Sequence, residues 1–130
     1  MRLGVAERVI WAGAHAEVER FYGAADLVAL PSLYEPFGNV HLEALASGLP
    51  VLASSRSGGA EVITPGETGW ILNDPEDPGE ICRGLQALRE GESGRWRDAA
   101  RAAAEPFTYA AQARAFTELY RKITEGGKNR

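Results

Sequence analysis

Glu35 and Glu43 stand on either side of a turn that leads into a helix-forming segment. The apolar run at 27–30 predicts a short buried strand, and Gly38 predicts a turn before a helix that begins near Asn39. The first N–H groups of a helix have no partner inside the helix and carry partial positive charge. Because Gly38 has no Cβ, a ligand can approach the backbone closely there. These residues therefore predict an anion site framed by two carboxylates.

Two carboxylates would repel a phosphate placed between them, so Glu35 and Glu43 are better suited to accept hydrogen bonds from hydroxyl groups. A ligand with sugar hydroxyls on both sides of a diphosphate would satisfy every group of this site. The N–H groups at the helix start would hold the phosphates, and each glutamate would face one sugar. Such a ligand is a nucleotide-sugar. We expect its base to meet His15 or the backbone at Gly13.

Simpler explanations of the same residues remain open. With 14 glutamates among 130 residues, a pair at this separation is expected by chance. Glu43 near a helix start is favourable for electrostatic reasons alone, by about 0.3–1 kcal/mol, and Glu35 can be a solvated loop residue. His41 is expected on the helix surface, and His15 is equally explained as a loop residue without a function. Spacing alone therefore does not establish a site.

Composition is ordinary for a soluble globular protein, with 45% hydrophobic and 25% charged residues in a chain long enough for one domain. The net charge of -4 argues against a nucleic-acid partner. No apolar run approaches the roughly 20 residues that span a bilayer, and no signal-peptide pattern opens the chain, so a cytoplasmic location is expected. The single cysteine, Cys82, excludes an internal disulfide and is expected to be buried.

The order of predicted elements indicates the fold class. Apolar runs predict four strands, at 8–12, 27–30, 51–54 and 68–72. Helical patterns predict six helices, at 16–25, 40–47, 60–63, from about 73 to 89, at 95–104, and after a cap at Thr108. This alternation predicts an α/β fold with a parallel sheet, flanking helices and a helical C-terminus.

A parallel sheet would place the functional loops together. The loops at 13–15, 31–39 and 54–59 would all lie at the carboxyl edge of the strands, where ligands of open α/β sheets bind. In the helix at 40–47, one face is expected to be buried because its apolar residues recur at helical spacing, at Leu42, Leu45, Ala46 and Leu49.

Residues 31–54, PSLYEPFGNVHLEALASGLPVLAS, resemble the donor-binding signature of group 1 (family 4) glycosyltransferases, with its Glu–seven residues–Glu motif at Glu35 and Glu43. Three later segments resemble the family's downstream segments in the same order, at 57–63, 66–69 and 107–109. The resemblance covers essentially the whole chain. It implies the GT-B architecture of two Rossmann-like domains, with residues 1–130 forming most of the C-terminal, nucleotide-sugar-binding domain.

The resemblance also implies roles for individual residues. Glu35 would contact the hydroxyls of the donor sugar and is the candidate catalytic residue, whereas Glu43 would bind the ribose. The sugar and diphosphate would be contacted by Phe37, Gly38, Asn39 and Val40. The family transfers a sugar, here of the hexosyl type, from a nucleotide donor with retention of anomeric configuration. It generally requires no metal, so neither a metal nor another cofactor is expected.

Two portions of the family pattern are not found in this sequence. One is the acceptor-binding domain, and the other is a first β-α-β portion whose Arg and Lys neutralise the diphosphate. Arg56 is expected at the same sheet edge, either as a partial substitute or as a solvated loop residue. We therefore expect the isolated chain to be incomplete and poorly active, with an N-terminal acceptor domain or another chain as its partner.

Two other functions stay open. The first is a non-catalytic nucleotide-sugar-binding or assembly module that pairs with another chain, or with a second copy, through an exposed sheet edge. The second is a fragment of a GT-B nucleotide-sugar epimerase, which is less favoured because the signature is that of the transferases.

Overall fold

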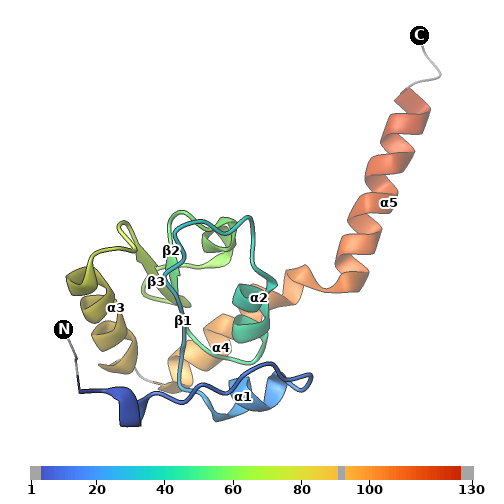
Figure 1. Ribbon diagram of the computed structural model, residues 1–130. Helices are drawn as coiled ribbons and strands as arrows, with labels where there is room; N and C mark the ends of the chain where they lie inside the picture. Colours follow the sequence, from blue (N-terminus) through green and yellow to red (C-terminus); the bar gives the residue numbers. More distant parts are fainter. Residues whose placement is uncertain (1–3, 91–92, 127–130) are drawn as a thin grey trace.

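The computed structural model describes residues 4–90 and 93–126 (Figure 1). A parallel sheet of three strands, in the order β1-β2-β3, forms the centre. The strands are β1 (Val28–Leu30), β2 (Val51–Ser54) and β3 (Gly69–Leu72). The α-helices are α1 (Glu19–Ala24), α2 (Asn39–Ala46), α3 (Pro78–Glu90), α4 (Ser93–Ala104) and α5 (Tyr109–Gly126). The described residues also form three short 3-10 helices, at Ala6–Arg8, Gly58–Val62 and Glu105–Phe107.

The central strand β2 separates two apolar clusters, because successive side chains of a strand point to opposite faces. Val51 and Ala53 pack with residues of α2 and α4 on one face, including Leu45 and Ala100. Leu52 packs on the other face with residues of β3 and α3, including Leu72 and Leu88. Figure 1 shows α3 on one side of the sheet and α2 with α4 on the other. This confirms the predicted α/β class with flanking helices.

The strand predicted at 8–12 is absent, and this prediction is wrong. A 3-10 helix covers Ala6–Arg8, and the chain then runs irregularly, with Ile10 89% and Trp11 92% exposed. Strand-forming residues stabilise a strand only where they fit a pleated and half-buried surface. Among the described residues, no strand pairs with this segment, so its backbone has no ladder to join.

Helix α3 begins later than the pattern around 73–76 predicts. The carboxylate of Glu80 accepts hydrogen bonds from the backbone N–H groups of Asn73 and Asp74, both at 2.9 Å, which stabilises a turn outside the helix. Asp77 then caps the helix by accepting from the Gly79 N–H at 2.8 Å. The cap predicted at Thr108 is confirmed, because its Oγ1 accepts from the Ala111 N–H at 3.2 Å at the start of α5.

The buried face of α2 differs in part from the prediction. Leu45 and Leu49 are buried as expected, but Leu42 is only half-buried and Ala46 is exposed. The helix is rotated so that His41 and Ala44 face the interior in their place. Cys82 of α3 was expected to be buried and is exposed, because it lies off the stripe that packs on the sheet.

Helix α5 leaves the body of the molecule and points away from the sheet (Figure 1). None of its residues is buried. In the part of the chain that the structure describes, no helix is both long enough and apolar enough to cross a membrane. The cytoplasmic location stays a prediction.

Candidate functional site

The loop between β1 and α2 ends in a turn that only glycine accommodates well. Gly38 directly precedes α2 and has a φ of 72°, in the left-handed region. A Cβ at this position would lie 2.9 Å from both Glu35 Cγ and His41 Nδ1. In the described chain, the N–H groups of Gly38, Asn39 and Val40 make no hydrogen bond. The start of α2 therefore presents unpartnered donors, as the sequence predicted.

This loop is joined to the loop that follows β2. The Gly58 N–H donates to the Glu35 carbonyl at 3.0 Å, and Glu35 forms an isolated parallel bridge with Ser57. A Cβ on Gly58 would overlap the Pro36 carbonyl, so the two backbones approach as closely as glycine permits. The prediction that the loops at 31–39 and 54–59 meet at the carboxyl edge of the sheet is confirmed.

The predicted donor-site residues differ in exposure along this corner. Glu35 and Phe37 are half-buried in the loop, whereas Asn39 and Val40 are exposed on the first turn of α2. Glu43 is exposed one turn further along the same helix. The structure thus places both glutamates beside the N–H groups at the start of α2. We call the segment from Glu35 to Glu43 the loop–helix corner.

Glu43 has a partner that the sequence did not reveal. The Tyr22 hydroxyl of α1 donates a hydrogen bond to Glu43 Oε2 at 2.8 Å. Burial first, then the hydrogen bond to Glu43 and the negative charge of that carboxylate, raise the pKa of Tyr22 to about 12. Tyr22 therefore stays protonated at neutral pH and holds the carboxylate in one orientation. The other oxygen, Oε1, makes no hydrogen bond within the described chain.

Gly13 and His15 lie in the irregular segment that precedes α1. His15 is exposed, with its Nε2 2.7 Å from the Ala12 carbonyl and its ring 4.8 Å from that of Phe21. Among the described residues, neither Gly13 nor His15 hydrogen-bonds to the loops that carry Glu35 and Ser57. The expectation that the loop at 13–15 joins the sheet edge depended on the absent strand at 8–12. Their binding of the base stays a prediction.

Arg56 pairs with two carboxylates on the surface. Its guanidinium lies 3.9 Å from Asp74 and 3.7 Å from Glu76, in an exposed cluster beside the turn that precedes α3. Such surface pairs contribute at most about 1 kcal/mol, but they occupy the guanidinium with two carboxylates. No group of three or more His, Cys, Asp and Glu that could hold a metal occurs within residues 4–90 and 93–126.

His41 is the functional candidate that the sequence interpretation missed. It was expected on the surface of α2 and is completely buried, because it lies on the face of the helix shared by Ala44 and Leu45. Its Nδ1 is 2.7 Å from the Gly38 carbonyl, and its Nε2 is 3.3 Å from Ser57 Oγ. The helical spacing of three and four residues to two small or apolar positions was the signal that could have found it.

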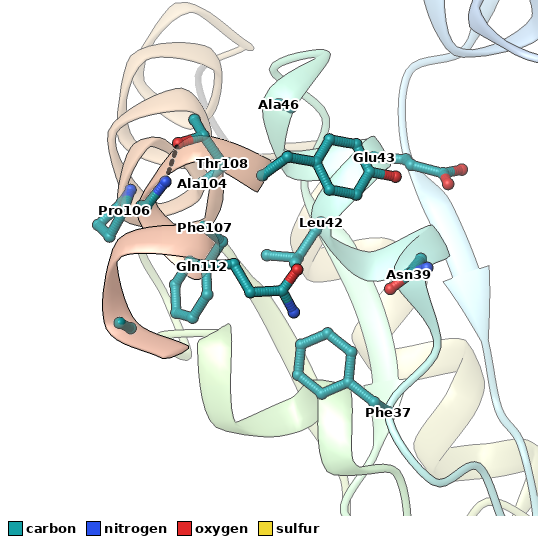
Figure 2. Close-up of a pocket in the computed structure, with 13 residues that line it drawn as sticks. Phe37, Asn39, Leu42, Glu43, Ala46, Ala104, Pro106, Phe107, Thr108 and Gln112 are labelled. Atoms are coloured by element: carbon teal, nitrogen blue, oxygen red, sulfur yellow. Dashed lines mark hydrogen bonds between the residues drawn. The ribbon is translucent and has the colours of Figure 1, made fainter. Parts of the chain in front are cut away.

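A cavity of about 660 Å³ lies on the outer side of α2. Phe37, Asn39, Leu42 and Glu43 line it from the loop and from α2. Figure 2 shows the Glu43 carboxylate directed away from Phe107 and Gln112. The opposite wall comes from the residues around Thr108 and the first turns of α5. Three predicted donor-site residues thus border a hollow with mostly apolar walls.

A parallel sheet with helices on both faces, and with two loops and a helix start gathered at its carboxyl edge, defines a Rossmann-like domain. The family model of the glycosyl transferases group 1 matches residues 1–90. The chain belongs to this family.

Relatives and solved structures agree with this assignment. The chain is 40% identical over 90 residues to an uncharacterized glycosyltransferase of Methanocaldococcus jannaschii, covering 67% of this chain and 23% of the relative. It is 38% identical over 122 residues to a D-inositol 3-phosphate glycosyltransferase of Corynebacterium diphtheriae, covering 91% of this chain and 28% of the relative. The crystal structure of Anabaena HepE in complex with UDP-glucose matches with a TM-score of 0.78 and 31% identity, covering 92% of this chain and 34% of HepE.

These matches confirm the GT-B fold assignment made from the sequence. The chain spans about a quarter to a third of the length of the proteins that it matches.

Proposed function

We propose that this chain is the donor-binding domain of a retaining, hexosyltransferase-type glycosyltransferase and binds a nucleotide-diphosphate sugar. The observation that carries the proposal is the corner at Gly38. There, unpartnered N–H groups at the start of α2 lie between the loop residue Glu35 and the helix residue Glu43.

Each part of the corner matches one part of such a ligand. The N–H groups of the first turn suit the diphosphate, because they are donors at the positive end of a helix. The Glu43 carboxylate, oriented by Tyr22, suits the two hydroxyls of a ribose. Glu35 then faces the transferred sugar and orients its hydroxyls, and holding the departing diphosphate stabilises the transition state. The anomeric configuration is retained, and no metal is needed.

The charge balance explains why the isolated chain should bind weakly. A helix N-terminus contributes at most about 2 kcal/mol toward an anion, which is too little to offset the desolvation of a diphosphate. Arg56 is engaged by Asp74 and Glu76. By the family resemblance, the remaining positive charge is supplied by the first β-α-β portion of this domain. The acceptor site is supplied by an N-terminal acceptor domain or another chain, so the isolated domain is a poor catalyst.

The solved complexes of HepE support the choice of ligand. That protein has been crystallised with UDP and with UDP-glucose, and its structure superposes on most of this chain. We therefore select UDP and UDP-glucose as the first probes, with GDP and GDP-mannose as alternatives of a different base and sugar.

Calorimetry with these four probes tests the proposal. We expect millimolar or tighter binding of at least one of the sugar nucleotides, and a loss of about tenfold or more in Glu43→Ala, because hydrogen bonds to charged groups contribute about 1.5–3 kcal/mol each. Glu118→Ala, on the exposed surface of α5, is the matched control. The absence of binding at millimolar concentration, or unchanged affinity in Glu43→Ala, would contradict the proposal. Added EDTA should leave the affinity unchanged.

A second candidate function is an assembly module, and one observation favours it. Within the described residues, β1 pairs with β2 alone and leaves its other edge open. Ile10 and Trp11, in the segment before α1, are almost fully exposed. Open edges and exposed apolar residues are typical of sites for association. Sedimentation velocity at several concentrations discriminates the two functions. A monomer at all concentrations, unchanged in Trp11→Ser, would exclude self-association through this surface.

A further inference from the structure

The buried ring of His41 uses both of its nitrogens. Its Nδ1 lies 2.7 Å from the Gly38 carbonyl, and a carbonyl oxygen can only accept a hydrogen bond. Nδ1 therefore carries a proton. Its Nε2 lies 3.3 Å from Ser57 Oγ, a group that can donate or accept. The ring is completely buried, so both nitrogens need partners within the protein. These contacts favour the Nδ1–H tautomer.

The neighbouring donors complete this assignment. The Gly59 N–H donates to Ser57 Oγ at 3.3 Å, so one lone pair of the serine oxygen is occupied. The serine hydroxyl then donates to Nε2, which is an acceptor in the Nδ1–H ring. The result is a continuous relay from Gly59 through Ser57 and His41 to the Gly38 carbonyl. Every polar atom of the buried ring has a partner.

Close packing fixes the position of the His41 ring within this chain of hydrogen bonds. A Cβ on Gly59 would overlap the ring of His41, so the ring lies directly against the glycine backbone. The relay starts in the loop after β2 and ends at the residue that precedes α2. The hydrogen bond from the Gly58 N–H to the Glu35 carbonyl joins the same two loops. His41 therefore ties the helix start to both loops.

We propose that His41 is a positioning residue: its ring holds the Gly38 carbonyl and the Ser57 hydroxyl at a fixed separation, and so fixes Glu35 relative to the start of α2. This inference rests on the proposed donor site. Loss of the ring frees the loop at 57–59, and Glu35, which is bonded to Gly58, moves with it. Glu43 is held separately by Tyr22 on the exposed side of α2, so its place is retained.

The first test is independent of any ligand. The chain contains two histidines, and long-range ¹H–¹⁵N correlation of their rings reports the protonated nitrogen of each. At neutral pH, His41 should show the Nδ1–H pattern, whereas the exposed His15, whose Nε2 donates to the Ala12 carbonyl, should not. Ser57→Ala removes the donor to Nε2, so it should shift the Nε2 resonance and accelerate hydrogen exchange of the Gly59 amide. An Nε2–H or doubly protonated His41 ring would overturn the proposal.

The second test separates the sugar from the nucleotide. In His41→Leu, we expect the affinity for UDP-glucose to fall about tenfold relative to that for UDP, as for the loss of a buried hydrogen bond. UDP affinity itself should change less than twofold, because the N–H groups proposed to hold the diphosphate belong to the first turn of α2 and Glu43 is held by Tyr22. His41→Asn keeps a donor for the Gly38 carbonyl and should lose less. Ser57→Ala should resemble His41→Asn, and the neighbouring exposed Ser55→Ala is the control.

The outcomes distinguish the proposed function from the positioning role of His41. If the unmodified chain binds neither UDP nor UDP-glucose, the proposed function fails, and the tautomer and hydrogen-exchange results still decide whether the relay exists. Equal losses for UDP and UDP-glucose in His41→Asn and Ser57→Ala would show general loosening and would overturn the positioning role. If His41→Leu does not fold, these two milder variants carry the test.

Discussion

The Tyr22 hydroxyl and the Glu43 carboxylate form a hydrogen bond of 2.8 Å between α1 and α2. The bond connects two helices that are separated by β1 in the chain. It leaves Oε1 of Glu43 without a hydrogen bond in the described residues, on a helix face that borders the cavity of Figure 2. A residue outside the family motif thus sets the orientation of the Glu43 carboxylate.

Removal of this hydroxyl should weaken nucleotide binding. In Tyr22→Phe, we expect a loss of about two- to tenfold in affinity for UDP, since a single hydrogen bond contributes about 0.5–1.5 kcal/mol. Isothermal titration calorimetry measures the effect. Tyr120→Phe, at an exposed position of α5, provides a control that should bind as the unmodified chain does. Unchanged affinity in Tyr22→Phe would show that the bond does not orient Glu43 for binding.

The same pair should make the fold sensitive to alkaline pH. The pKa of Tyr22 is raised from 10.0 to about 12 in the folded chain, so the folded state holds the phenolic proton more tightly than the unfolded state. The stabilisation is complete below about pH 10 and is lost as the pH rises toward 12. Urea unfolding at intervals over this range should show a steeper loss of stability in the unmodified chain than in Tyr22→Phe. If stability falls equally with pH in both proteins, the raised pKa of Tyr22 is contradicted.

Low pH should destabilise the turn before α3. Hydrogen bonds from the backbone of Asn73, then of Asp74, lower the pKa of the Glu80 carboxyl below its ordinary 4.5. The stabilisation is therefore present above about pH 4.5 and is lost as the pH falls through the lowered folded value. Glu80→Gln should reduce this acid dependence, whereas Glu118→Gln on α5 should not. The two variants are compared by urea unfolding between neutral and acidic pH.

Close packing of α3 on the sheet should depend on Gly84. A Cβ at this position would lie 2.6 Å from Leu52 Cδ1 and 2.9 Å from Trp70 Cδ1. Gly84→Ala should therefore destabilise the chain by about 1–3 kcal/mol, as overpacking does. Gly23→Ala, in α1, has open space around the new methyl group and should be neutral or slightly stabilising. Urea midpoints followed by tryptophan fluorescence give both values.

Local patterns were sufficient for the parts of the fold that short-range interactions determine. The strands at Val28–Leu30 and Val51–Ser54 follow from short apolar runs bounded by prolines and polar residues. The start of α2 follows from Gly38, whose backbone conformation the sequence indicated. The meeting of the loops at Glu35 and Ser57 followed from the parallel topology, because parallel strands place their ends at one edge.

The remaining features depend on tertiary contacts between residues that are distant in the sequence. The segment at 8–12 has the composition of a strand, but a strand exists only with a partner, and among the described strands it has none. His41 is polar, and only the position of Ser57 and the Gly38 carbonyl makes its burial favourable. Tyr22 could not be assigned to Glu43 because 21 residues separate them and no motif links them.

The outward course of α5 has a thermodynamic consequence. This helix of 18 residues has no buried residue, and its apolar side chains at Phe116, Leu119, Tyr120 and Ile123 are exposed. Isolated helices gain little stability in water, because tertiary packing supplies most of it. In the free chain, α5 should therefore melt as a separate cooperative unit, below the temperature at which the sheet unfolds. Far-ultraviolet circular dichroism and tryptophan emission would then report different midpoints for one molecule.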